Sequence, residues 1–165
     1  MSDRLKFRAT FPVSYYDENG NDKDIKLTIY DVAVYSGGEI GFSAQQIETI
    51  INALELSEVE QDTMWQFIND NYATSCYEWF VCDNAIIEQC TGLSDKIGNL
   101  IYESDYVKDK DGDIYLVKWD SELVQFQATG KDNCGFETIT PFMKGETETL
   151  EICGNIHEQA EQKDK

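Results

Sequence analysis

Residues 5–29 read LKFRATFPVSYYDENGNDKDIKLTI. Apolar and polar side chains alternate in both halves of this stretch, with the period of two that is typical of a half-buried β-strand. Between the halves, Asn19-Gly20 supplies residues that tolerate the positive φ angles of a tight turn. The stretch therefore predicts an N-terminal β-hairpin whose second strand pairs back on the first.

A pair of helices is predicted next, within about residues 43–72. Ser43-x-x-Gln46 and Ser57-x-x-Glu60 both have the form of a capping box, which marks the start of a helix. Apolar residues follow each cap at helical spacing: Ile47, Ile50, Ile51 and Leu54, then Met64, Trp65, Ile68 and Tyr72. These stripes are expected to face a core.

The remainder of the chain is typical of β-structure. Residues 77–90 have strand-like composition, and short apolar runs alternate with turns after Thr91. The predicted strands are Tyr102–Lys108, Ile114–Trp119, Leu123–Ala128, Phe136–Ile139 and Leu150–Ile156. Strands of this length and spacing favour a small β-barrel over about residues 91–157. We therefore expect an α+β, mostly β fold in a single domain of residues 1–158, followed by a polar tail at 159–165.

Charge is the strongest compositional feature. The formal net charge is −19, and no Lys or Arg lies between Lys26 and Lys96, an interval that holds twelve acidic residues. Such a region repels nucleic-acid phosphates and attracts basic surfaces over roughly 8–10 Å in physiological salt. We expect a basic protein as partner and no direct binding of nucleic acid. The alternative is that the acidity only maintains solubility.

Sequence motifs for catalysis are absent. The five cysteines lack CxxC spacing and are expected to be free thiols. Residues 109–113 resemble a calcium loop but lack the glycine and glutamate of an EF-hand, so Asp111-Gly112 is interpreted as a hairpin turn. The single histidine, His157, has no positioned nucleophile nearby in sequence. We therefore predict a non-enzymatic protein with no catalytic residues, metal site or cofactor.

The sequence also bears on where the protein resides. Residues 1–8 lack the apolar run of a secretory leader, and no stretch approaches the 18 or so apolar residues of a membrane helix. A cytoplasmic protein without a membrane contact is expected.

Acidic and aromatic side chains are the candidates for contact with a partner. They are Glu48, Glu55, Glu58, Glu60, Asp62, Asp70, Trp79 and Trp119. Tyr and Trp are favoured anchors at protein interfaces, although both tryptophans are also candidates for the core. In one alternative, the helical acids imitate DNA phosphates and inhibit a DNA-binding or defence protein. In another, edge strands pair between protomers and the protein is an oligomeric scaffold.

One segment resembles a known family. Residues 91–108, TGLSDKIGNLIYESDYVK, are similar to the hallmark of YopX-like phage and prophage proteins, which typically reads TGLKDKNGKEIYEGDIVK. The opening of the chain (Leu5–Ala9) and its close (Cys153–Glu158) are also similar to that family. The resemblance covers about residues 4–9 and 88–158 and leaves out the helical pair.

The resemblance implies a C-terminal SH3-like barrel and an origin in a phage or prophage, with no catalytic residues to transfer. It also implies that the basic partner is a host or phage protein, that an inhibited DNA-binding or defence protein belongs to the host, and that the protein resides in the cytoplasm of a bacterial host cell. Two positions depart from the family pattern: Ile97 stands where Asn is usual, and Ser104 where Gly is usual. Because Gly and Asn tolerate positive φ, these departures are expected to alter turn geometry.

Overall fold

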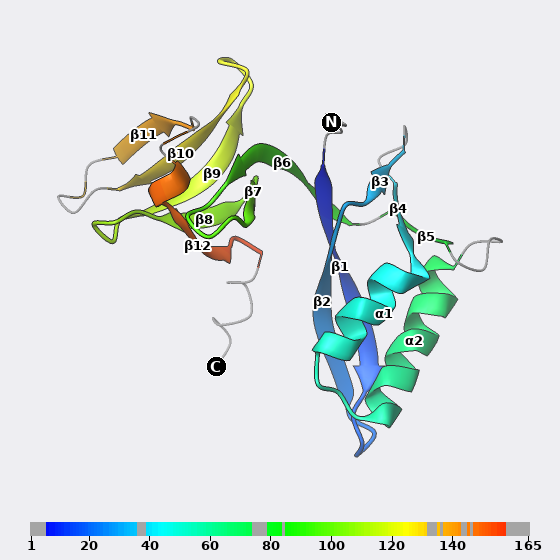
Figure 1. Ribbon diagram of the computed structural model, residues 1–165. Coiled ribbons are helices and arrows are strands. Elements are labelled where there is room, and N and C mark those ends of the chain that lie inside the picture. Colours follow the sequence, from blue (N-terminus) through cyan, green and yellow to red (C-terminus); the bar gives the residue numbers. More distant parts are fainter. Residues whose placement is uncertain are drawn as a thin grey trace. The chain divides into compact units, whose positions relative to one another are not determined.

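The computed structural model describes residues 6–35, 39–73, 79–83, 85–131, 135, 137–142, 145 and 147–157 (Figure 1). The chain divides into two compact units, one of residues 6–87 and one that begins at residue 88. We refer to them as the N-terminal and C-terminal units and describe each by itself. The predicted polar tail at 159–165 lies outside the described residues, and the single-domain boundaries stay a prediction.

The predicted hairpin is confirmed. Strands β1 (Phe7–Tyr16) and β2 (Asp22–Tyr30) pair antiparallel over their full lengths. Gly20 in the turn has φ +77°, a conformation that glycine adopts without steric cost. The half-buried expectation is wrong for the first half of β1, because Arg8 and Thr10 on its polar side are also buried. The hydroxyl of Thr10 lies 2.9 Å from that of Thr28 across the strand pair.

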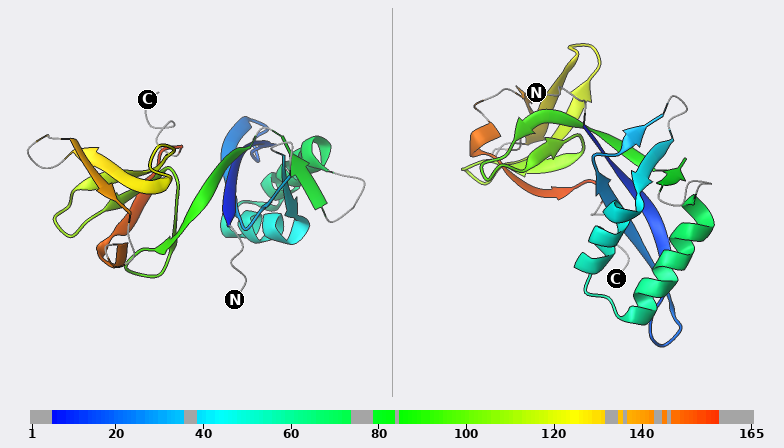
Figure 2. Two further views of the ribbon diagram at one scale, coloured as in Figure 1. Left: turned by 90° about the horizontal axis from the view of Figure 1, so that it is seen from above. Right: turned by 45° about the vertical axis from the view of Figure 1, so that its right-hand side comes forward.

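The predicted helical pair is also confirmed. Helix α1 spans Ala44–Ala53 and helix α2 spans Glu58–Tyr72, each preceded by a complete capping box. In the first box the Ser43 hydroxyl accepts from the Gln46 backbone N–H, while the Ser43 N–H donates to the Gln46 side chain. The two helices lie side by side on one face of the β1–β2 hairpin (Figures 1 and 2).

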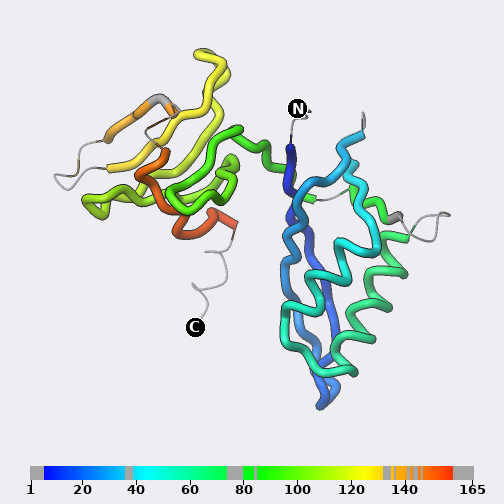
Figure 3. The backbone as a smooth tube through the Cα atoms, viewed as in Figure 1, coloured from blue at the N-terminus to red at the C-terminus, as the bar shows by residue number. Residues whose placement is uncertain are grey.

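A three-stranded sheet in the N-terminal unit is absent from the sequence prediction. It consists of β3 (Ala33–Val34), β4 (Ile40–Ser43) and β5 (Trp79–Cys82), with β4 in the centre. The chain passes from β4 directly into α1 and returns from α2 to β5 (Figure 3). Because these strands have only two to four residues, no alternation of the kind found in β1 has room to develop.

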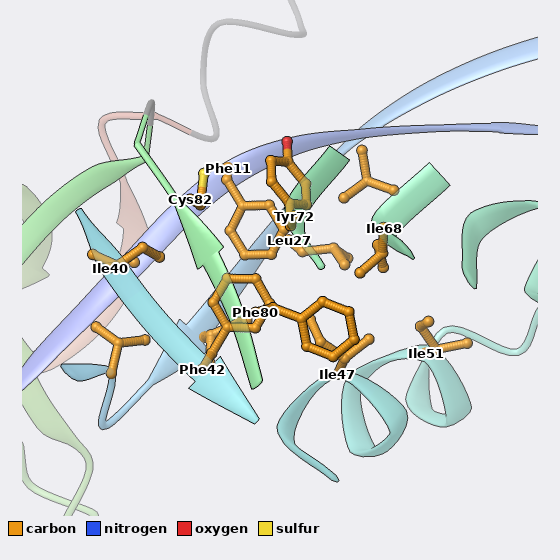
Figure 4. Close-up of a cluster of buried hydrophobic side chains, with 14 of the residues drawn as sticks. Phe11, Leu27, Ile40, Phe42, Ile47, Ile51, Ile68, Tyr72, Phe80 and Cys82 are labelled. Atoms are coloured by element: carbon orange, nitrogen blue, oxygen red, sulfur yellow. The ribbon is translucent and has the colours of Figure 1, made fainter. Parts of the chain in front are cut away.

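Aromatic side chains dominate the core of the N-terminal unit (Figure 4). Phe42 stacks on Phe11 on one side and on Phe80 on the other, at ring-centroid distances of 5.1 and 5.7 Å. Met64 and Ile68 of α2 are fully buried beside them, as the apolar stripe predicts. Cys82 also lies in this core as a free thiol.

The C-terminal unit contains a curled five-stranded antiparallel sheet in the order β11-β10-β9-β8-β12 (Figure 1). Its strands are β8 (Asp105–Lys108), β9 (Ile114–Asp120), β10 (Gln125–Lys131), β11 (Glu137–Pro141) and β12 (Glu151–Asn155), with the 3-10 helix η1 (Thr147–Thr149) before β12. Strand β6 (Ile86–Ser94) enters this unit and pairs there with β7 (Leu100–Tyr102).

One of the strands predicted in this unit is wrong. The predicted strand Tyr102–Lys108 is divided by a turn at Glu103-Ser104, so that β7 and β8 are separate strands. Ser104 has φ +68° in that turn and therefore keeps the left-handed conformation that suits the glycine usual in the family. Ile101, Val107 and Val117 form the buried centre of the unit.

Candidate protein-binding surface

Helix α2 presents acidic side chains along one line of its exposed surface. Glu58, Asp62 and Asp70, together with Gln66, follow one another at intervals of four residues and are all exposed. Residues at this spacing are neighbours on a helix, and twelve residues at 1.5 Å each extend over about 18 Å. Within the described part of the chain, the three carboxylates make no hydrogen bond or ion pair. We call Glu58, Asp62 and Asp70 the acidic ridge.

The other acids predicted on the helices are placed differently. Glu60 is half-buried, and its Oε2 atom accepts hydrogen bonds from the Ser57 backbone N–H and hydroxyl at 2.9 and 2.8 Å. Its carboxylate therefore stabilises the start of α2. Glu48 is exposed on α1, and Glu55 is exposed in the connection between the helices with φ +51°.

A groove of about 330 Å³ lies between the end of the hairpin and α2. Its lining residues are Ser14, Tyr15, Tyr16, Asp22, Thr63, Gln66, Phe67 and Asp70. It combines three aromatic residues with two carboxylates, one from each wall: Asp22 from β2 and Asp70 from the ridge. We call it the acidic groove.

The walls of the groove are held by contacts between β1 and α2. The Tyr16 backbone N–H donates to the Thr63 hydroxyl oxygen at 3.2 Å. Phe67 packs edge-to-face on Tyr72 at 6.1 Å, and the Tyr72 hydroxyl donates to the Pro12 carbonyl at 2.8 Å. Burial raises the pKa of Tyr72 to about 12, so this donor keeps its proton at physiological pH. The groove is therefore formed by elements anchored in the core.

The two acidic residues of the groove are not paired with other side chains of the described residues. Lys23, which neighbours Asp22 in sequence, lies 3.6 Å from Asp17 and forms an ion pair with it. Neither Asp22 nor Asp70 has a hydrogen-bonded or ionic side-chain partner among the described residues. Asp70 also lies in the last turn of α2, where the helix dipole disfavours a negative charge. Its position therefore gives no stability to the helix.

The two candidate tryptophans belong to the strands β5 and β9. Trp119 belongs to β9 of the C-terminal unit, is 41% exposed and packs edge-to-face on Phe126 at 5.0 Å. The backbone of Trp79 lies in β5, opposite Ser43, but its side chain lies outside the described residues. An interface role for either side chain stays a prediction.

Another cavity, of about 400 Å³, lies in the C-terminal unit. Tyr115, Phe142 and Leu150 supply much of its apolar lining. Asp109 is the acid among its lining residues, and that carboxylate is already engaged: Oδ2 accepts from the Tyr115 hydroxyl, and Oδ1 accepts from the backbone N–H of Asp111 and Asp113. The hairpin-turn interpretation of residues 109–113 is confirmed, with Gly112 at φ +91°.

The remaining candidates for chemistry are dispersed. His157 Nε2 lies 3.6 Å from the buried carboxylate of Glu88. Cys90 is buried and Cys153 exposed, both as free thiols, whereas Cys76 and Cys134 lie outside the described residues. Over the residues that the structure describes, no group of three or more His, Cys, Asp or Glu is arranged to hold a metal ion. In the same residues, no helix is long and apolar enough to cross a membrane.

The segment that carries the family resemblance has a structural role here. Asp95 is 5% exposed, and its Oδ1 atom accepts from the backbone N–H groups of Ile97 and Asn99 at 3.0 and 2.8 Å. Its second oxygen accepts from the Ile152 N–H of β12 at 3.5 Å. Burial opposes ionisation of Asp95, but these hydrogen bonds outweigh it and lower the pKa. The turn at residue 95 thereby connects the hallmark segment to the last strand.

A second acid of this segment has a similar role. Asp105 is 1% exposed, and its Oδ2 atom accepts from the Tyr102 N–H across the turn at 2.8 Å. The Ser104 N–H donates to the Val117 carbonyl, and the Ile156 N–H donates to the Ser104 carbonyl. The hallmark therefore specifies two turns and their connections to β9 and β12.

Comparison with known families agrees with the resemblance. A family profile described as YopX protein matches residues 41–162, which is most of the chain. The protein therefore belongs to the YopX family. No curated protein matches the chain. The match includes α1 and α2, so the expectation that the helical pair lies outside the family pattern is wrong.

The sequence prediction named the acids of α2 but missed the groove beside them. The four-residue spacing of Glu58, Asp62 and Asp70 is visible in the sequence and predicts one line on a helix. By contrast, nothing in the sequence indicates that Tyr16 and Asp22 at the end of the hairpin lie against α2. That contact depends on how the helix packs on the strands.

Proposed function

We propose that this protein is a non-enzymatic binding module that holds a basic protein partner through the N-terminal unit. The observation that carries the proposal is the acidic ridge on α2, whose three exposed carboxylates have no partner in the described residues. One of the three residues, Asp70, also lines the acidic groove. No Lys or Arg between residues 27 and 95 neutralises them.

The energetics of α2 support a role for the ridge outside the fold. Like charges at i and i+4 destabilise a helix by about 0.2–0.5 kcal/mol, as applies to Glu58 and Asp62. A negative charge in the last turn costs about 0.3–1 kcal/mol, as applies to Asp70. Acids that lie exposed in a line, one of them at the end of the helix that disfavours its charge, are suited to a basic surface on another protein.

Several finer features belong to the same proposal. The C-terminal unit is proposed to be an SH3-like barrel, supported by its curled five-stranded sheet. We also propose an origin in a phage or prophage, which membership of the family supports, and action in the bacterial cytoplasm. Mimicry of DNA is less well supported than binding of a basic protein, because the carboxylate of Glu60 is engaged in the helix cap and is not free to represent a phosphate.

The test uses a fluorescein-labelled peptide of alternating arginine and serine, with fluorescence anisotropy as the readout of binding. The ridge variant carries Glu58→Gln, Asp62→Asn and Asp70→Asn. The control variant carries Glu122→Gln, Glu137→Gln and Glu148→Gln, three exposed acids of the C-terminal unit, and changes net charge equally. Melting temperatures of both variants establish that each is folded.

We expect the ridge variant to bind the peptide about tenfold more weakly than the wild type, from roughly 0.5 kcal/mol for each exposed ion pair that is lost. The control variant is expected to bind within about twofold of the wild type. Equal weakening by both variants would mean that only net charge matters and would overturn the proposal.

A further inference from the structure

We infer that the acidic groove is a binding site for a single arginine side chain of the partner protein. This inference rests on the proposed function and specifies which residue of the partner is recognised. The inference is based on the groove and not on the ridge alone, because the groove is a cavity whose lining has a defined chemistry.

The size of the groove fits one long side chain. Its volume of about 330 Å³ is at the small end of the range of about 300–1,000 Å³ for small-molecule and cofactor sites. The groove is also open between a hairpin and a helix of the N-terminal unit, so that a side chain on another protein can enter it without a rearrangement of the core.

The chemistry of the lining fits a cation. Tyr15, Tyr16 and Phe67 are its aromatic lining residues, and the face of an aromatic ring attracts a cation. Asp22 of β2 and Asp70 of α2 are the acidic lining residues, and among the described residues neither is engaged by a side chain of this protein. Lys23 does not fill the role, because it is ion-paired with Asp17.

Arginine fits this lining better than lysine does. The guanidinium group is planar, stacks on aromatic faces and carries five N–H donors, so it reaches carboxylates on two sides at once. A lysine ammonium is a compact and strongly hydrated charge that gains less from an aromatic surface. The rigid walls, fixed by Thr63 and by the contact of Phe67 with Tyr72, reduce the entropy lost on binding.

The experiment compares three labelled peptides that differ at one kind of position: alternating arginine and serine, lysine and serine, or citrulline and serine. Citrulline keeps the shape of arginine and removes the charge. Each is titrated into the wild type, Tyr16→Leu, Tyr15→Leu and the control Tyr30→Leu. Tyr16 and Tyr30 are both 53% exposed, but only Tyr16 lines the groove. The leucine substitutions keep an apolar side chain and remove the aromatic ring.

The wild type is expected to bind the arginine peptide about fivefold more tightly than the lysine peptide, and the citrulline peptide not measurably. The preference for arginine is expected to disappear in Tyr16→Leu or Tyr15→Leu and to persist in Tyr30→Leu. Melting temperatures separate loss of the groove from loss of the fold.

Two failures remain distinguishable. If the arginine and lysine peptides bind alike, with both affinities reduced in the ridge variant but not in the groove variants, the arginine site is refuted and the proposed function stands. If neither charged peptide binds the wild type, both are refuted.

Discussion

The hydroxyl of Tyr72 donates a hydrogen bond of 2.8 Å to the backbone carbonyl of Pro12, which joins the last turn of α2 to the middle of β1. Tyr72 also contacts Phe11 and Phe42 edge-to-face. This one side chain therefore links the helical pair to the hairpin on which the acidic groove depends.

Alkaline pH is expected to weaken this link. Burial first, and the nearby Cys82 and Asp83 next, raise the pKa of Tyr72 from about 10 to about 12. The folded state thus holds a proton that the unfolded state releases above about pH 10, so that this contribution to stability is complete below pH 10 and is lost as the pH rises through 12. Tyr72→Phe removes the proton and should flatten the fall of unfolding free energy between these pH values.

Urea unfolding at a series of pH values tests whether Tyr72 contributes to the alkaline loss of stability. At neutral pH, Tyr72→Phe is expected to cost about 1 kcal/mol for the lost hydrogen bond, whereas Tyr16→Phe at an exposed position should change stability by less than about 0.5 kcal/mol. Identical alkaline slopes in Tyr72→Phe and the wild type would contradict this account.

The turn at Ser104 is expected to be strained. Its φ of +68° costs a residue with a Cβ atom roughly 1–2 kcal/mol, and glycine avoids most of this. Glycine loses more conformational entropy on folding than serine does, and this cost offsets part of the gain. Ser104→Gly should therefore raise the unfolding free energy by about 0.5–1 kcal/mol. Ser94→Gly in β6 has no such strain to relieve and should be destabilising. Chemical denaturation measures both, and a destabilised Ser104→Gly would refute the interpretation.

Low pH is expected to destabilise the hallmark turn through protonation of Asp95. Its pKa is lowered in the fold, so its contribution to stability is present above the unfolded value near 4 and is lost as the pH falls through the folded value. Asp95→Asn should cost about 1–2 kcal/mol at pH 7 and make unfolding less dependent on pH below 4. Asp111→Asn, an exposed turn acid, is the control. A wild-type acid response that Asp95→Asn leaves unchanged would count against the assignment.

Substitution of an acid by lysine is expected to have opposite effects on stability at the two ends of the acidic ridge. Asp70→Lys replaces an unfavourable charge in the last turn of α2 with a favourable one and should raise the unfolding free energy by about 0.5 kcal/mol. Glu58→Lys makes the reverse change in the first turn and should lower it by a similar amount. Both substitutions should weaken binding of the arginine–serine peptide. A loss of stability in Asp70→Lys would refute the view that function, and not folding, places an acid there.

Local signals in the sequence predict much of this fold. The two serine caps fix the starts of α1 and α2, and alternation with Asn19-Gly20 fixes the hairpin, because each of these features acts within a few residues. Strand β4 was missed because it has only four residues, and the last of them, Ser43, is itself the cap of α1. The division of residues 102–108 was missed because Ser104 is not a residue type that indicates a positive φ.

The candidate site was less predictable than the fold. The ridge follows from helical spacing, and its acids were all named in the sequence analysis. The groove depends on the packing of Tyr16 against Thr63, 47 positions away in sequence, and no local pattern encodes such a contact. By contrast, the capping box predicted at Ser57-x-x-Glu60 already places the Glu60 carboxylate at the Ser57 backbone N–H, and the structure has the two atoms 2.9 Å apart.

The most direct test is an amide chemical-shift titration of isotope-labelled protein with the arginine–serine peptide, followed by the same titration with duplex DNA. We predict that the peptide shifts resonances of residues 14–16, residue 22 and the exposed side of α2 from Glu58 to Asp70, while DNA leaves them unchanged. Peptide-induced shifts confined to residues 88–157, or a DNA response at the α2 resonances, would contradict the central claim that the N-terminal unit binds a basic protein.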